Sequence, residues 1–409
     1  MMIIISSSIC LADDKIEEVN TINFKQTIQT ASSIEKEPKI NARAAVVIDR
    51  DTKEVLYGKN ETSQRAMAST TKIMTAMVVI QNTNLDNIVT ISKKAAGTGG
   101  SRLKLKAGDK ISVKDLLYGL MLRSGNDAAV ALAEYVGGST QEFAELMNQN
   151  AENIGLANTH FITPHGLDSQ QHYTTAYELA ILADYALQNE VFSQIVNTKT
   201  ATITINGVSR TIHNTNELLG NLNGVYGVKT GFTNGAGRCL VTSIKRENLD
   251  LICVVLGADT KKDRTRDSIN LIEYTFKNYK TISLRNKIEE VFKEWNEMNY
   301  QRIEIEKGEN KDLSLRLEMK ESDEYYPIKK GTEEELEIEI QVSKVLKAPV
   351  EENTPIGKLM VYYQGNRIKE IPIINSTYIP RKRVPNYLLD FVKNYDNYLE
   401  EVFTKQNPQ

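Results

Sequence analysis

The sequence predicts an α/β chain of the α+β type: a long domain that mixes helices with an antiparallel sheet, then a small all-β domain, then an amphipathic helix. Three observations predict this. Helical hydrophobic patterns and strand-like runs are mixed between residues 44 and 279. Beyond about residue 285, apolar residues alternate with charged ones, as in an antiparallel sheet with one face in water. Residues 384–403 then carry apolar side chains at helical spacing.

The long domain is assigned to residues 41–282, a length that one domain can reach. It begins with a predicted hairpin, in which AAVVID (44–49) and EVLYG (54–58) flank a turn at Arg50–Lys53. Residues 70–82 are apolar on nearly every side, which predicts a buried helix. The same patterns predict helices over 113–122, 127–136, 175–188 and 267–279, and strands over 201–205, 208–213, 225–229, 239–244 and 250–256.

The second domain, residues 286–380, shows alternation with a period of two in several segments. LEIEIQV (336–342) is one of them, and LMVYYQGNRIKEIPII (359–374) predicts a hairpin that turns at Gln364–Asn366. The segments around Ile303 and Leu315 follow the same rule. Since none of them carries a catalytic motif, we predict a spacer or docking domain built from strands.

The first 40 residues have patterns of their own. Residues 1–12 (MMIIISSSICLA) form a short apolar run followed by Asp13 and Asp14, which is typical of a secretory signal segment. The polar residues 13–40 predict a flexible leader. From the signal segment we expect an exported, extracytoplasmic protein. Because no other stretch approaches the ~18 apolar residues of a membrane span, we expect that it does not span the membrane.

The tail, residues 381–409, predicts an amphipathic helix behind the basic cluster Arg381–Arg383. Such a helix can lie on a membrane surface. Its polar face is largely acidic, which weakens adsorption to anionic lipid, so membrane binding and simple packing against another surface both stay open. The apolar face consists of Val384, Leu388, Phe391, Val392, Tyr395, Leu399, Val402 and Phe403.

Charge and composition exclude several functions. The net charge is −3 and no basic block is present, so nucleic acid is not an expected partner. Cys239 and Cys253 lie in apolar strand-like segments, where two buried thiols are favoured over a disulfide or a metal pair. The histidines form no HExxH motif and lie at no zinc-finger spacing from a cysteine, so no metal and no cofactor is expected. They are His160, His165, His172 and His213.

Ser69-Thr70-Thr71-Lys72 is the first candidate catalytic motif. A serine hydroxyl is a weak nucleophile until a base takes its proton. Residues three apart share a helix face, and a lysine buried there can lose its charge and act as that base. Ser69 at a helix N-terminus also gains from the helix dipole.

Ser124-Gly125-Asn126 lies at a turn between two predicted helices. There it can present a hydroxyl that relays a proton and an amide that binds a peptide. A helix cap followed by an N-cap is the alternative for this segment alone.

Lys229-Thr230-Gly231 ends a predicted strand. A cation and a hydroxyl on an edge strand suit a substrate carboxylate, and Gly231 lets another backbone approach closely. The amide of the next residue, Phe232, can pair with that of Ser69 as an oxyanion hole. A strand followed by a plain turn is the alternative here.

The order SxxK, SxN, KTG is that of the penicillin-recognising serine enzymes. The chain resembles their low-molecular-mass D-alanyl-D-alanine carboxypeptidases of the peptidase S11 type. The resemblance covers roughly residues 41–380 and implies a penicillin-binding, β-lactamase-like transpeptidase fold for the first domain. Further matching segments are GSRLKLKAGDKISV (100–113), TPHGLDSQQHYTTAYELA (163–180) and TGFTNGAGRCLV (230–241).

The resemblance implies the reaction. Ser69 would attack the penultimate D-Ala of a peptidoglycan stem peptide, and Lys72 would be the acylation base. Ser124 would relay a proton to the departing D-Ala, and β-lactam antibiotics would be covalent inhibitors. Asn126 would orient the peptide and the deacylating water.

It also implies how the substrate is held. Lys229 and Thr230 would bind the terminal carboxylate, and Arg264 occupies the position of a family arginine that serves the same group. From the residues alone, a surface ion pair is an equal alternative for Arg264. His165 lies on a family loop near the site, where a structural hydrogen bond is the favoured role. In such relatives the β domain raises the catalytic domain above the membrane and the C-terminal helix anchors it, although this tail is less basic than such anchors.

Other functions compete with this one. A D,D-endopeptidase has the same catalytic set. A class A β-lactamase shares the fold, but it usually has Ser-Asp-Asn as its second motif and a glutamate that activates water, for which Glu178 is the candidate here. A non-catalytic wall-binding scaffold would not need Ser69 and Lys72. A zinc D,D-peptidase would need a His/Asp/His set that these histidines do not provide.

Overall fold

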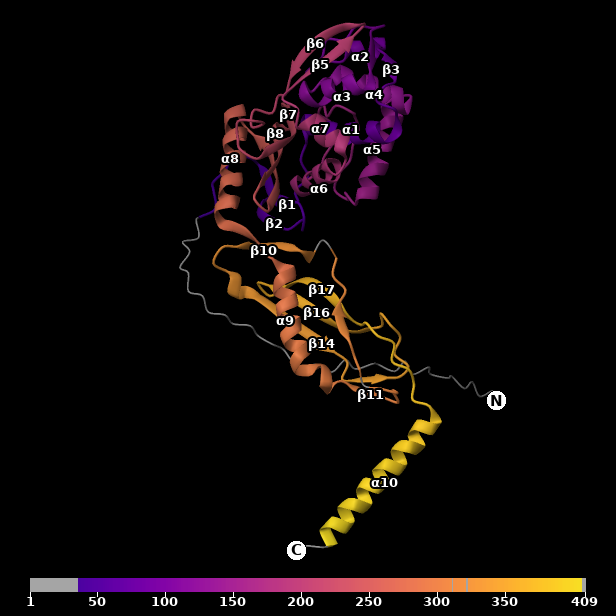
Figure 1. The fold of residues 1–409 in the computed structure, drawn as a ribbon. Coiled ribbons are helices and arrows are strands. Elements are labelled where there is room, and N and C mark those ends of the chain that lie inside the picture. Colours follow the sequence, from indigo (N-terminus) through magenta and orange to yellow (C-terminus); the bar gives the residue numbers. More distant parts are fainter. Residues whose placement is uncertain (1–35, 311, 321–322, 407–409) are drawn as a thin grey trace, which may run out of the picture. The chain divides into compact units, whose positions relative to one another are not determined.

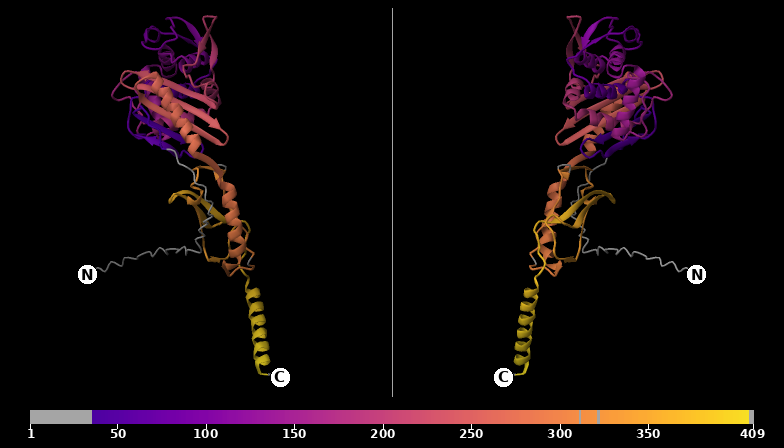
Figure 2. Two further views of the ribbon diagram at one scale, coloured as in Figure 1. Left: turned by 90° about the vertical axis from the view of Figure 1, so that its left-hand side faces the viewer. Right: turned by 90° about the vertical axis from the view of Figure 1, so that its right-hand side faces the viewer.

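The structure is a computed structural model that describes residues 36–310, 312–320 and 323–406. These residues divide into two compact units, one formed by 36–281 with 327–330 and the other by the remaining described residues from 282 onward. Figures 1 and 2 show their elements. The predicted signal segment and most of the predicted leader fall outside the described residues, and 36–40 have no regular secondary structure.

A five-stranded antiparallel sheet with the order β2-β1-β9-β8-β7 is the frame of the first unit. Its inner strands are buried on both faces, which explains their continuous apolar runs. Val46 packs into the core on the side of most helices, whereas the next residue, Val47, packs into a core with α8. The strands are β1 (Ala44–Asp49), β2 (Val55–Lys59), β7 (Val225–Thr233), β8 (Gly237–Arg246) and β9 (Leu249–Ala258).

Helices cover both faces of this sheet (Figure 1). α8 (Lys261–Asn278) packs on one face, and α6 (Ala176–Leu187) contacts β1 and β9 on the other. α1 (Lys72–Asn82) lies among α3, α4, α5, α6 and α7, which explains why it is apolar on nearly every side. The other helices are η1 (Ala68–Thr71), α2 (Lys93–Gly97), α3 (Val113–Leu122), α4 (Asn126–Gly137), α5 (Thr140–Ile154) and α7 (Glu190–Val196).

A second, four-stranded sheet of the first unit has the order β3-β4-β5-β6. Its four strands pair antiparallel, and α3 contacts three of them. The strands are β3 (Ile88–Thr90), β4 (Lys110–Ser112), β5 (Thr200–Ile205) and β6 (Val208–His213).

The predicted helices and strands of this unit are present, but some boundaries were wrong. The strand predicted over 225–229 continues to Thr233, so Gly231 lies inside the strand and not in a turn. The helix predicted over 267–279 begins at Lys261, because Thr260 Oγ1 accepts a hydrogen bond from the Asp263 amide at 3.0 Å and caps it. Arg264 therefore lies inside the first turn of α8 rather than before the helix. α2, α5 and α7 were not predicted; the apolar spacing of α5 is interrupted by many polar residues.

The second unit contains the predicted β domain together with a helix that was not predicted. α9 (Leu284–Asn299) buries Ile288, Phe292 and Trp295 at helical spacing, so this region is not purely β. Its main sheet has the order β12-β17-β16-β14, and β16 and β17 form the predicted hairpin. The strands are β11 (Glu304–Glu306), β12 (Leu315–Leu317), β14 (Leu336–Val342), β15 (Val345–Lys347), β16 (Pro355–Tyr363) and β17 (Asn366–Asn375).

The remaining described elements include the short 3-10 helices η2 (Tyr300–Arg302) and η4 (Glu333–Glu335). β10 (Tyr279–Ser283) and β13 (Tyr325–Lys329) form a two-stranded sheet. The tail forms the predicted helix, α10 (Val384–Gln406). No helix within the described ranges is long and apolar enough to cross a membrane.

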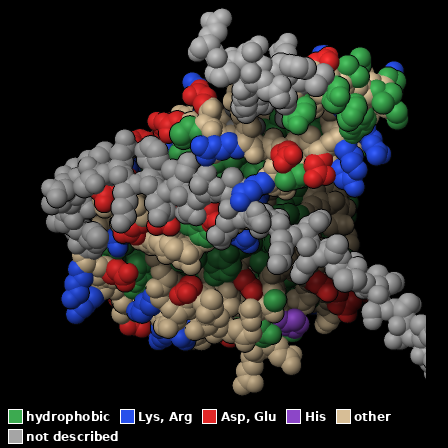
Figure 3. Space-filling view, turned by 90° about the horizontal axis from the view of Figure 1, so that it is seen from below, with side chains coloured by type: hydrophobic (Ala, Val, Ile, Leu, Met, Phe, Trp, Pro, Cys, Tyr) green, Lys and Arg blue, Asp and Glu red, His purple; other side chains and the backbone are tan. Residues whose placement is uncertain are grey.

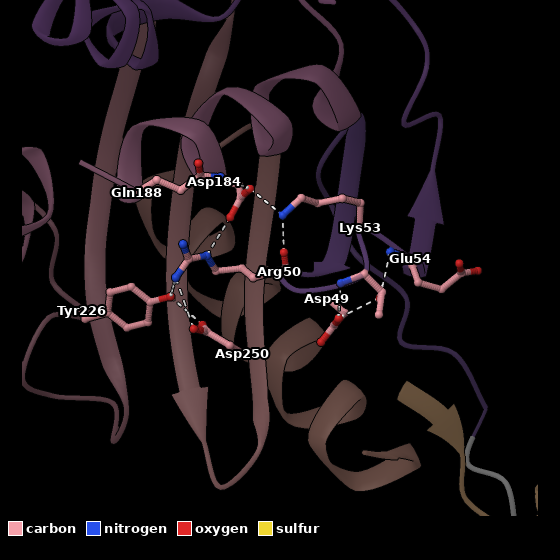
Figure 4. A network of polar contacts seen from close by, with 9 residues as sticks. Asp49, Arg50, Lys53, Glu54, Asp184, Gln188, Tyr226 and Asp250 are labelled. Carbon is pink, nitrogen blue, oxygen red and sulfur yellow. Dashed lines mark hydrogen bonds and ion pairs between the residues drawn. The ribbon is translucent and has the colours of Figure 1, made fainter. Parts of the chain in front are cut away.

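Arg50, in the turn after β1, connects three elements of the first unit (Figure 4). Its Nε donates a hydrogen bond to Asp184 of α6 at 2.9 Å, and its Nη1 donates to the Tyr226 hydroxyl at 2.8 Å and to Asp250 at 3.2 Å. Tyr226 donates to Asp250 at 2.5 Å, and Lys53 pairs with Asp184 at 2.5 Å. Because Tyr226 lies on β7, this network fixes the beginning of the strand that carries Lys229 and Thr230.

Candidate active site

Ser69 and Lys72 lie where η1 runs into α1. Lys72 Nζ is 2.8 Å from Ser69 Oγ, and it donates hydrogen bonds to Asn126 Oδ1 and to the His165 carbonyl, each at 2.8 Å. The lysine is fully buried. Burial and the nearby charge of Lys229 hold its pKa well below its usual value, although Asp127 opposes this shift. A neutral amine beside the hydroxyl is the arrangement that general-base activation requires.

Ser124 and Asn126 occupy the turn between α3 and α4. Ser124 has a φ of +59°, a backbone conformation that non-glycine residues rarely adopt and that often marks functional sites. It lines the cleft, where its hydroxyl faces the same space as Ser69. Asn126 donates from Nδ2 to the Gly99 carbonyl at 2.8 Å, which fixes the amide so that its oxygen meets Lys72. The turn also has the cap arrangement considered as the alternative from the sequence, because α3 has its C-cap at Arg123 and α4 has its N-cap at Gly125.

Lys229, Thr230 and Gly231 lie on β7, an edge strand of the main sheet. Lys229 is buried, donates to the Thr230 carbonyl at 2.9 Å, and has its pKa lowered to about 7 by burial and by the charge of Arg264. A Cβ on Gly231 would lie 3.1 Å from the Ser69 amide nitrogen. A side chain at this position would crowd the backbone of the nucleophile turn, so glycine lets β7 run close to Ser69.

These groups lie in or next to one cleft with a volume of about 480 Å³. Of the predicted residues, it is lined directly by Ser69, Ser124, Thr230, Gly231, Phe232 and Arg264. Lys72 and Asn126 do not line the cleft; Lys72 reaches it through its hydrogen bond with Ser69 and also binds Asn126. Lys229 is the neighbour of Thr230 on β7 and donates to its carbonyl.

Arg264 is 4% exposed although it lines the cleft. Its Nη2 lies 3.7 Å from the Glu217 carboxylate and 3.3 Å from Thr265 Oγ1, and its buried Nε has no hydrogen-bond partner among the described residues. Burial lowers the pKa of its guanidinium, Glu217 raises it, and Arg238 lowers it further. Arg264 is therefore a buried cation that pairs with the half-exposed Glu217, so the ion pair considered from the sequence is present although the arginine itself does not lie at the surface.

Several cleft residues were missed because they are isolated polar residues on separate loops, strands and helix ends, outside any motif. Thr215 Oγ1 lies 2.8 Å from Thr230 Oγ1, and Glu217 follows on the same loop. The guanidinium of Arg238 lies 3.5 Å from the centre of the Phe232 ring, a cation–π contact at the rim of the cleft. The remaining missed residues that line it are Ser101, Arg123, His213, Asn214 and Lys261.

The loop 162–172 holds the nucleophile turn from the other side. His172 Nε2 lies 2.8 Å from Thr71 Oγ1, and its Nδ1 accepts a hydrogen bond from the Ile162 amide at 2.9 Å. His165 accepts from the Leu167 amide at 3.2 Å, the structural hydrogen bond expected of it, and burial lowers its pKa to about 3. Both histidines are therefore neutral at neutral pH, and His172 donates to Thr71.

Glu178, the residue considered as a water-activating base, has a different role. Its carboxylate accepts hydrogen bonds from the Asn158 amide at 2.8 Å and from the Thr159 hydroxyl at 2.6 Å. These contacts fix a loop to the first turn of α6, and Glu178 does not line the cleft with Ser69. The structure thus offers no support for a class A β-lactamase mechanism through this residue.

Cys239 and Cys253 are free and buried on β8 and β9, as the sequence favoured. Within the part of the chain that the structure describes, no group of three or more His, Cys, Asp or Glu side chains could hold a metal ion.

Comparisons with known proteins agree with this geometry. Residues 31–260 match the family model of D-alanyl-D-alanine carboxypeptidases, peptidase S11, and residues 290–381 match that of the penicillin-binding protein 5 C-terminal domain. The chain is 35% identical over 339 residues to the D-alanyl-D-alanine carboxypeptidase DacF of Bacillus subtilis (strain 168), covering 81% of this chain and 84% of the relative.

Solved structures are similar as well. Penicillin-binding protein 5 from Haemophilus influenzae superposes with a TM-score of 0.69 at 30% identity, covering 85% of this chain and all of the other. The Streptomyces K15 DD-transpeptidase superposes with a TM-score of 0.57 at 37% identity, covering 59% of this chain and 99% of the other.

Proposed function

The chain belongs to the peptidase S11 family of D-alanyl-D-alanine carboxypeptidases, and from this premise we propose that it removes the terminal D-alanine of peptidoglycan stem pentapeptides through an acyl-enzyme on Ser69. The observation that carries the proposal is the convergence of three separate motifs on one cleft, with Lys72 Nζ 2.8 Å from Ser69 Oγ.

Acylation begins when Lys72 accepts the proton of Ser69 and Oγ attacks the carbonyl carbon of the penultimate D-Ala. The amides of Ser69 and Phe232 stabilise the oxyanion, supported by the close approach of Gly231 to Ser69. The C–N bond then breaks, and the proton passes from Lys72 through Ser124 to the amine of the departing D-Ala.

Cationic and hydroxyl groups on one side of the cleft hold the terminal carboxylate. Lys229, buried next to Thr230 on β7, contributes positive charge. Thr230 contributes its hydroxyl, which is oriented by Thr215 because their Oγ1 atoms lie 2.8 Å apart. Arg264 adds a guanidinium that lines the cleft. In deacylation, Asn126 orients the peptide and the water that attacks the ester of Ser69. A β-lactam follows the same first step and stays attached as an inhibitor.

The proposal is tested by incubating the chain from about Asp13 with diacetyl-Lys-D-Ala-D-Ala and measuring free D-alanine, with Ser69→Ala alongside. Release by the wild type and not by the variant supports it. A folded wild type that forms a penicillin adduct but releases no D-alanine points to a D,D-endopeptidase. If the wild type shows neither release of D-alanine nor a penicillin adduct, a non-catalytic wall-binding scaffold remains as the explanation.

We further propose that the protein acts outside the cytoplasmic membrane and that α10 adsorbs to the membrane surface. Leu388, Phe391 and Val392 of this helix are each more than half exposed, and Phe391 stacks on Tyr395. Figure 3 shows hydrophobic side chains gathered at the surface seen from below, near Lys and Arg side chains. Exposed apolar side chains at helical spacing favour burial in the headgroup region.

Vesicle sedimentation tests this part of the proposal. The full chain should sediment with vesicles containing phosphatidylglycerol, and a chain that ends at Pro380 should stay in the supernatant. The variant Leu388→Ser with Phe391→Ser keeps the charges of the tail, so it separates apolar adsorption from charge attraction. Equal sedimentation of all three proteins would contradict adsorption through α10.

A further inference from the structure

The loop between β6 and β7 carries a carboxylate to the edge of the cleft. Asn216 fixes this loop: its side chain is buried and donates from Nδ2 to the Gly227 carbonyl at 2.9 Å. The Thr215 amide donates to the Leu122 carbonyl at 3.0 Å. Glu217, the next residue, is therefore held by its backbone, while its side chain is 46% exposed and reaches toward α8.

Glu217 has two cationic partners on the first turn of α8. It pairs with Lys261, and its other carboxylate oxygen lies 3.7 Å from Arg264 Nη2. Glu217 and Lys261 line both the cleft of about 480 Å³ and a neighbouring cavity of about 590 Å³. This ion pair thus stands at the end of the cleft where Arg264 is proposed to meet the departing residue.

The charges around this end are unequal. Arg123, Arg238, Lys261 and Arg264 line the cleft, whereas Glu217 is its one carboxylate among the described residues. A compact cavity of 480 Å³ is about 10 Å across, close to the screening length of ~8 Å at physiological salt, so neighbouring charges inside it interact. A leaving residue that carries one carboxylate satisfies Arg264. A second carboxylate on that residue would be attracted by the cations of the cleft, and the negative charge of Glu217 would weaken that attraction.

We propose that Glu217 is a specificity-determining residue for the departing amino acid: its charge offsets part of the positive charge of the cleft and so lowers the preference for an acidic departing residue relative to a neutral one such as D-alanine. This inference rests on the proposed carboxypeptidase function. Its physical basis is repulsion between like charges, which weakens the binding of an acidic departing residue and leaves that of a neutral one almost unchanged.

The test compares diacetyl-Lys-D-Ala-D-Glu with diacetyl-Lys-D-Ala-D-Gln, which have nearly the same shape and differ in charge. We expect the ratio of their kcat/KM values, Glu over Gln, to rise about 5- to 10-fold in Glu217→Gln, the size of one partly screened like-charge contact. Lys261→Met, which removes the partner cation, should lower the ratio. Glu273→Gln, a half-exposed glutamate paired with Arg246 away from the cleft, is the matched control and should leave it unchanged.

The outcomes separate the two proposals. Absence of D-Ala-D-Ala cleavage by the wild type would overturn the proposed function itself. Cleavage with an unchanged Glu/Gln ratio in Glu217→Gln would overturn only this inference, and so would a higher KM for D-Ala-D-Ala in that variant, because it would show that Glu217 merely positions Arg264. If the bulkier peptides are not cleaved, their inhibition constants against D-Ala-D-Ala cleavage give the same ratio.

Discussion

Lys72 Nζ touches Ser69 Oγ at 2.8 Å, while Lys229, a second fully buried lysine, lowers the pKa of Lys72 by its charge. The two lysines have opposite requirements, since Lys72 must be neutral to act as a base and Lys229 must be charged to hold a carboxylate. Burial lowers both pKa values, which favours the neutral form of Lys72 and opposes the charged form of Lys229.

The pH dependence of the reaction follows from this pair. For the free enzyme, kcat/KM should rise as Lys72 loses its proton and fall as Lys229 does so, near pH 7. Substrate carboxylate raises the pKa of Lys229, so the falling limb should shift upward in kcat. Stopped-flow penicillin acylation across pH 5–10 measures the profile. A kcat/KM that rises without a falling limb to pH 10 would contradict the assignment of Lys229.

Substitution of Lys72 tests the base directly. Lys72→Met keeps the apolar stem and removes the amine, and we expect acylation by penicillin to fall at least about 10³-fold. The fold should survive, because a buried amine is replaced by a group that needs no hydrogen bond. A variant that acylates at the wild-type rate would show that another group takes the serine proton.

Gly231→Ala tests the close approach of β7 to the nucleophile. The added methyl group would meet the Ser69 amide at 3.1 Å and the Met67 carbonyl at 3.2 Å, so the oxyanion amides must separate. We expect a loss of about 10²- to 10³-fold in acylation rate, the cost of one lost oxyanion donor. Gly97→Ala, where an added methyl meets open space, serves as the control and should acylate normally.

His172 is expected to be a positioning residue for the nucleophile turn. Its buried ring links Thr71 to Ile162 through one donor and one acceptor, a role that the amide of glutamine can reproduce in part and leucine cannot. His172→Leu should lower kcat about 10- to 100-fold, and His172→Gln should recover much of that loss. Equal activity of the two variants, with thermal stability measured in parallel, would show that the ring only fills space.

Arg50→Met tests the network in Figure 4. The change leaves Asp184 and Asp250, both largely buried, without their shared cation, and we expect a loss of about 3–5 kcal/mol in the free energy of unfolding of the first unit. Arg43→Met breaks an exposed pair with Asp259 and should cost less than about 1 kcal/mol. Urea unfolding of both variants measures the difference; similar midpoints would contradict the role assigned to Arg50.

Much of the fold could be predicted because helices and strands each impose a characteristic spacing of apolar residues within a short segment. α1, α3, α4, α6 and the strands of the main sheet repeat apolar residues at spacings that a short window reveals. The start of α8 was missed because its polar first turn depends on the Thr260 cap rather than on apolar spacing. α9 was missed because its apolar stripe is narrow and interleaved with charged residues.

The sequence by itself determined the reaction, because Ser69 with Lys72, Ser124 with Asn126, and Lys229 with Thr230 are each short local motifs whose order is specific. Only the tertiary structure decided the environment of that reaction. It buried the two lysines and so lowered their pKa values, placed Arg264 in the cleft wall, and added Thr215 and Glu217 from one loop and Arg238 from β8. The pKa of a side chain depends on its burial and on the charges within a few ångströms of it. The spacing of residues in the sequence does not give these distances.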